Sequence, residues 1–103
     1  MPVKHAVFLR VKKEAPTQIV ADFFAELAGF GRHVPGMLNF SGGPYSSPEG
    51  LNQGFTHGFV MTFADELSRD TYLTHPEHDK VKAFMFPWIE GGVNGVIAVD
   101  WTS

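Results

Sequence analysis

Apolar and polar residues alternate along residues 3–11 and 54–63, and residues 96–101 predict the last strand. A period of two is typical of strands with one buried face. In the first two stretches the odd-numbered positions form the more apolar face, and this face also carries His5 and His57. Residues 37–41 predict a further short strand, and the glycine, proline and serine of residues 42–50 predict a loop.

The apolar spacing changes to a helical period in two other regions. The first helix is predicted to begin at Pro16 and Thr17 and to end near Gly29. The second follows Asp65, which can cap it. Pro76 is expected to interrupt that helix, because proline clashes with the preceding turn, and a new helix can restart with Pro76 in its first turn.

The predicted order is β-α-β-β-α-β, which indicates a single α+β domain over residues 1–103 with the ferredoxin-like fold. In this fold an antiparallel sheet carries its helices on one face, and the first and third strands are central neighbours. His5 and His57 are therefore expected to project into the same space between sheet and helices. The helical region that carries Tyr72 and His78 should close over that space.

The other face of the sheet carries Phe8 and Val60 among small and polar residues. This face is too apolar to be left in water comfortably, and no third layer remains in the chain to cover it. We therefore predict that Phe8 and Val60 point away from the helices. The sheet face then forms the interface of a homodimer.

Composition removes several classes of function. The chain has 103 residues, with 8 basic and 11 acidic side chains and a net charge of −3. No basic stripe suggests nucleic-acid binding, and no apolar run reaches the length of a membrane span. Cysteine is absent, which excludes disulfides, thiolate metal sites and cysteine nucleophiles. These features predict a soluble, cytoplasmic protein that binds neither nucleic acid nor membrane.

The stretch Tyr72-Leu-Thr-His75-Pro-Glu-His78 carries the candidate chemistry. Histidine titrates near neutral pH and can remove a proton next to a carbonyl, while a tyrosine hydroxyl can hold the carbonyl oxygen as charge develops. The helix break at Pro76 is expected to let Tyr72 and His78 converge. The alternative is structural: Tyr72 at the edge of the core and His78 bonded to backbone at a helix start.

His75 and His78 also invite comparison with a metal site, since imidazole suits zinc, copper or nickel. Their spacing of three differs from the usual helical spacing of four, and Pro76 breaks the helix between them. We predict no metal here and expect His75 to serve as a cap or rim residue.

The start Val3-Lys4-His5, the Pro48-Glu49-Gly50 turn, the Thr56-His57 pair and the His75-Pro-Glu-His78 element resemble the stress-responsive A/B barrel domain (Dabb) family. The resemblance runs from Val3 to about Trp101. It implies a ferredoxin-like domain that forms a dimeric α+β barrel. Some plant relatives hold a structural magnesium through backbone carbonyls. The resemblance implies that such a site, if present here, would lie near Gly31 to Met37.

The Dabb family, which the sequence resembles, includes plant stress proteins that form stable oligomers, bacterial proteins without known activity, and a plant polyketide cyclase. The cyclase implies Tyr72 and His78 as catalytic residues in a reaction that needs no cofactor. It implies a substrate cavity lined by His5, His57, Phe23, Phe24, Leu27 and Phe59. Three functions stay open: a cyclase or isomerase acting on an apolar carbonyl compound, a non-enzymatic stress-related oligomer, and a cofactor-free monooxygenase.

Overall fold

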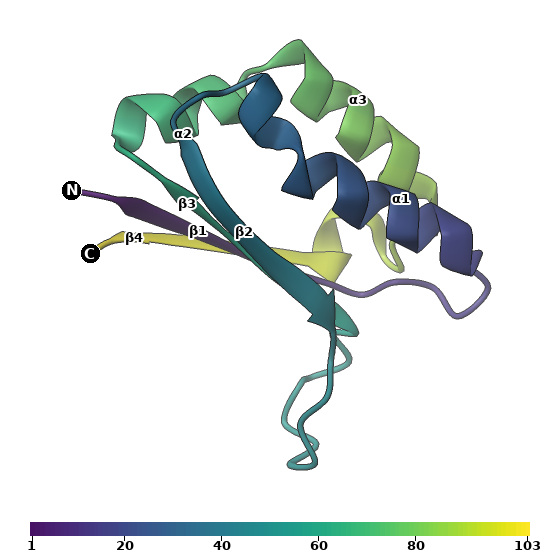
Figure 1. Ribbon diagram of the computed structural model, residues 1–103. Coiled ribbons are helices and arrows are strands. Elements are labelled where there is room, and N and C mark those ends of the chain that lie inside the picture. The colour runs from purple at the N-terminus through teal and green to yellow at the C-terminus, as the bar shows by residue number, and fades with distance from the viewer.

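The computed structural model describes residues 1–103 as one four-stranded sheet with helices on one face (Figure 1). The strands are β1 (Val3–Leu9), β2 (Met37–Pro44), β3 (His57–Phe63) and β4 (Val96–Thr102). The helices are α1 (Thr17–Ala28), α2 (Glu66–Leu73) and α3 (Pro76–Met85), with short 3₁₀ turns η1 (Phe30–Arg32), η2 (Phe86–Trp88) and η3 (Gly92–Gly95). The sheet order is β2-β3-β1-β4 and every pairing is antiparallel, which confirms the predicted ferredoxin-like α+β fold.

The core lies between the sheet and the helices. Helices α1 and α3 lie side by side over the sheet, while α2 crosses near the end where the chain termini lie (Figure 1). Met61 and Phe63 of the central strand β3 are fully buried, as are Leu27 of α1 and Tyr72 of α2. The alternation predicted for the two central strands is confirmed, because Val7 and Phe59 pair directly and both are buried in this layer.

Strand β2 is longer than its sequence suggests. Residues 42–44 were predicted as loop, but they pair with Phe59, Gly58 and His57 of β3. The prediction was wrong because Gly42 is needed for packing rather than for a turn. A Cβ atom at Gly42 would lie 2.8 Å from the ring of Phe24 and 2.7 Å from Cβ of Phe59. The loop that follows, residues 45–56, projects beyond the sheet (Figure 1).

The helical region breaks where proline predicted it would. Asp65 caps α2, accepting a 2.8 Å hydrogen bond from the Ser68 N–H. The helix ends at Leu73, and α3 restarts at Pro76. His75 is the N-cap of α3, and its Nδ1 accepts a 3.0 Å hydrogen bond from the Glu77 N–H. The expected role of His75 as a cap is confirmed. None of the helices is long and apolar enough to span a bilayer.

We expect His75→Ala to lower the free energy of unfolding by about 1 kcal/mol. Alanine cannot accept a hydrogen bond from the Glu77 N–H, which has no other partner within α3. His75→Asp should keep stability close to that of the wild type, since aspartate caps well. Urea unfolding of both variants measures the difference. Equal stability of His75→Ala and the wild type would show that the cap contributes nothing.

Candidate active site

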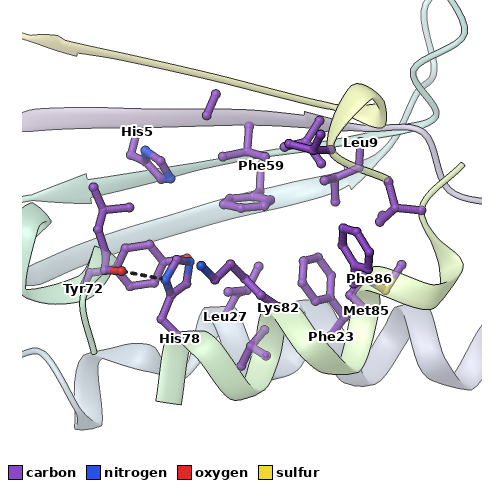
Figure 2. A pocket seen from close by; sticks show the side chains of 17 residues that line it. His5, Leu9, Phe23, Leu27, Phe59, Tyr72, His78, Lys82, Met85 and Phe86 are labelled. Carbon is purple, nitrogen blue, oxygen red and sulfur yellow. Dashed lines mark hydrogen bonds between the residues drawn. The ribbon is translucent and has the colours of Figure 1, made fainter. Parts of the chain in front are cut away.

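A pocket of about 300 Å³ lies between the sheet and helices α1 and α3 (Figure 2). This volume is at the lower end of the range for small-molecule sites. Of its 17 lining residues 14 are hydrophobic, so the pocket favours an apolar ligand. His5, Tyr72 and His78 stand together at one end, which we call the polar end, while Phe23, Met85 and Phe86 line the other end (Figure 2).

His5 is held from behind by an acidic residue of the edge strand. The side chain of His5 is buried, and its Nδ1 lies 2.7 Å from Oδ1 of Asp100, its register partner on β4. The other carboxylate oxygen of Asp100 accepts a 2.8 Å hydrogen bond from Nη1 of Arg69 on α2. Burial alone would raise the pKa of Asp100, but the hydrogen bonds from His5 and Arg69 lower it below its ordinary value.

An ionised Asp100 can only accept hydrogen bonds, so His5 must carry its proton on Nδ1. When the ring is neutral, Nε2 of His5 has a free lone pair. A carboxylate that fixes the tautomer and orientation of an imidazole in this way is a recurring arrangement in catalytic and metal sites.

Tyr72 and His78 meet across the break between α2 and α3. Their ring centroids are 4.3 Å apart, and the edge of Tyr72 also packs against His5, with centroids 5.8 Å apart. Nδ1 of His78 lies 3.2 Å from the carbonyl oxygen of Leu73. Because a carbonyl only accepts, His78 donates from Nδ1 and its Nε2 is the free base.

Burial sets the protonation of both residues. Desolvation lowers the pKa of His78 below its ordinary value; the Leu73 hydrogen bond opposes this, and the charge of Lys82 adds to it. Desolvation also raises the pKa of the Tyr72 hydroxyl well above its ordinary value. At neutral pH the site therefore holds a neutral imidazole, which can accept a proton, beside a phenol that keeps its proton for donation.

The structure brings together six of the eight residues predicted for the site. His5, Tyr72 and His78 line the pocket with Phe23, Leu27 and Phe59. His57 and Phe24 lie outside it, so the prediction that they share this cavity is corrected.

The register of the sheet explains the position of His57. His57 pairs with Leu9, whereas His5 pairs with Met61, four residues further along β3. Four residues of strand span about 13 Å. The rings of Phe59 and Phe24 lie between the two imidazoles, and Phe24 itself packs over Gly42. His57 instead bonds to Oγ1 of Thr56 at 2.8 Å, at the far end of the sheet.

Sequence reasoning missed Asp100, Arg69 and Lys82. Asp100 sits at a position of the last strand that alternates toward the helices, so a charged residue there was the available signal. Arg69 and Lys82 gave no signal, because charged residues on helices are usually solvated. Their roles depend on how α2 and α3 lie over the sheet.

No group of three or more histidine or acidic side chains is arranged to hold a metal ion. The His75 and His78 imidazoles are engaged separately, one with the Glu77 N–H and the other with the Leu73 carbonyl. Around residues 31–37, the carbonyls of Val34 and Gly36 accept backbone hydrogen bonds, and the segment has no acidic side chain. The segment thus offers a magnesium ion no carboxylate, and two of its carbonyls are already engaged within the chain.

Fold and site together define a ferredoxin-like domain with an apolar pocket whose polar end holds a phenol and two imidazoles. The chain belongs to the stress responsive A/B barrel domain (Dabb) family, whose model matches residues 3–103. It is 26% identical over 100 residues to the stress-response A/B barrel domain-containing protein HS1 of Arabidopsis thaliana, covering 97% of this chain and 88% of that protein.

Two further likenesses bear on the site and on assembly. The chain is 27% identical over 78 residues to olivetolic acid cyclase of Cannabis sativa, covering 76% of this chain and 77% of the cyclase. A crystal structure from Jannaschia sp., described as a dimeric ferredoxin-like protein of unknown function, superposes with a TM-score of 0.89. Its sequence is 26% identical, and the match covers 100% of both chains.

Proposed function

We propose that the pocket is the active site of a cofactor-independent lyase or cyclase that acts on an apolar carbonyl compound. The observation that carries this proposal is the contact of Tyr72 with His78 at the end of an otherwise apolar pocket. A phenol that stays protonated beside an imidazole that stays neutral is the pair that enolate chemistry requires. The likeness to olivetolic acid cyclase supports the same class of reaction.

The proposed step begins with the carbonyl oxygen at the Tyr72 hydroxyl. Nε2 of His78 accepts a proton from the carbon next to the carbonyl, and the electrons of that C–H bond form the enolate. The Tyr72 hydroxyl donates a hydrogen bond to the oxygen as its negative charge grows. The enolate carbon then takes the proton back or attacks a second carbonyl of the same molecule, and the His78 imidazolium returns the proton to the new alkoxide.

His5 has a supporting role in this proposal. Its free Nε2 can accept a hydrogen bond from a hydroxyl or enol of the substrate, while Asp100 fixes the ring. The apolar remainder of the pocket holds the body of the substrate and keeps water from the enolate, which strengthens each electrostatic contact.

The test is proton exchange rather than a guessed product. A simple apolar ketone such as acetophenone is incubated with the protein in deuterium oxide, and loss of the methyl proton signal is followed by NMR. We expect the protein to accelerate exchange above the buffer rate, and octanol to inhibit it by filling the pocket. Binding without acceleration would favour a non-enzymatic binding protein, and oxygen consumption with the ketone would favour a monooxygenase.

We further propose a homodimer assembled through the outer sheet face. The apolar residues of this face remain accessible in one chain: Phe8, Ile97, Val99 and Trp101 are each 42–50% exposed. Phe8 packs against Gly58, where a Cβ atom would come within 2.8 Å of its ring. The dimeric description of the Jannaschia structure supports this assembly.

We expect Phe8→Glu to convert the dimer to a monomer, because it places two carboxylates in an apolar interface related by symmetry. Light scattering should then give the mass of one chain, 11.4 kDa. Leu67→Glu makes the same chemical change at an exposed position of α2 and should leave the dimer intact. A dimer that survives Phe8→Glu would exclude this face as the interface.

A further inference from the structure

Lys82 is the only residue with a permanently charged side chain among those that line the pocket. It lies four residues after His78 on α3, so the two side chains share one face of the helix. Figure 2 shows the Lys82 side chain running along the pocket toward His78, with its nitrogen at the polar end. A cation thus stands beside the residues that would handle the carbonyl.

The positive charge of Lys82 is only weakly paired with acidic side chains of the protein. Its salt-bridge partner is Asp79, at 3.6 Å, and both side chains are mostly exposed, so the pair is weak. The carboxylate of Asp100, behind His5, is already engaged by His5 and Arg69. The Lys82 ammonium is therefore only weakly paired within the chain and can pair with an anionic ligand at the polar end.

We propose that the substrate carries a carboxylate that pairs with Lys82, and that it is an apolar β-keto acid or a close relative. This inference rests on the proposed function, since it places the carboxylate next to the carbon that His78 deprotonates. Deprotonation would put a second negative charge on such a substrate. Lys82 stabilises that charge at low cost because the cation is already in place before the reaction.

Binding of two matched, unreactive probes tests the inference. Octanoate and octanol have the same apolar chain and differ in charge, and their dissociation constants can be measured by NMR titration. We expect the wild type to bind octanoate about five to ten times more tightly than octanol, a preference that added salt reduces. Lys82→Gln should remove the preference by weakening octanoate alone. Lys80→Gln, on the same helix but outside the pocket, should keep it.

The results that would contradict the inference can be told apart from those that would contradict the proposed function. If the wild type binds both probes equally, the carboxylate is excluded while the pocket and its proposed chemistry stand. If Lys82→Gln weakens both probes alike, Lys82 acts through its aliphatic stem and the inference is wrong. If neither probe binds or inhibits ketone exchange, the pocket is not a ligand site, and the proposed function fails together with this inference.

Discussion

Replacing His78 with glutamine is expected to slow the exchange of ketone α-protons roughly 10²–10⁴-fold, the usual contribution of a general base. Glutamine can still donate a hydrogen bond to the Leu73 carbonyl, so the backbone at the start of α3 keeps its partner. It cannot accept a proton at neutral pH. The rate measured by NMR in deuterium oxide should therefore fall without a comparable change in octanol binding or in the free energy of unfolding.

His33→Gln is the matched control. His33 packs against Phe30 and His75, outside the pocket, and its replacement should leave the exchange rate unchanged. If His78→Gln retains most of the wild-type rate, His78 is not the base, and His5 becomes the remaining imidazole with a free lone pair in the pocket.

The pH dependence of exchange follows from the same burial. Neutral His78 is the active form and its pKa lies below the ordinary value of 6.5, so the rate should rise with pH and level off with a midpoint below 6.5. The raised pKa of Tyr72 keeps its proton in place through the ordinary tyrosine pKa of 10.0. No alkaline loss from Tyr72 is therefore expected below that pH, once the rate of His78→Gln is subtracted as background.

The fold could be predicted because its signals are local. Alternation with a period of two marked the central strands, and Pro76 marked the break between α2 and α3. Each signal is a steric or burial constraint that acts over a few residues. The length of β2 was missed because residues 42–44 carry loop-forming residues, and their pairing is decided by the neighbouring strand and by the ring of Phe24.

The sequence predicted which face of the sheet each site residue occupies, but not its position along the strand relative to its neighbours. The patterns placed His5 and His57 on the helix-covered face, which is correct. An antiparallel register can slide by two residues without changing which face a residue occupies. Alternation therefore could not reveal that His57 lies opposite Leu9, or that Asp100 lies opposite His5. Which carboxylate orients the His5 imidazole depends on the pairing register of two strands, and the sequence of a single strand does not contain that register.

The role of Asp100 leads to the second large effect. Asp100→Asn is expected to lower the free energy of unfolding by about 1.5–3 kcal/mol, the range for hydrogen bonds to charged groups. The change removes the anion that pairs with Arg69 and accepts from His5, two side chains that are largely buried. Asp70→Asn removes the other partner of Arg69, but Asp70 is 62% exposed, so the loss there should be below about 1 kcal/mol.

Acid should erase the difference between Asp100→Asn and the wild type. The folded pKa of Asp100 is lowered, so the carboxylate contributes its full stability above its ordinary pKa of 3.8 and loses it as pH falls through the folded value. The gap in unfolding free energy, measured with urea, should be complete at pH 7 and shrink below pH 3.8.

At neutral pH, ¹⁵N NMR should show His5 protonated on Nδ1 in the wild type. In Asp100→Asn this preference should be lost, because the asparagine amide can donate to Nδ1. A wild-type tautomer in this variant would mean that Asp100 does not orient His5, and its effect would be on stability alone.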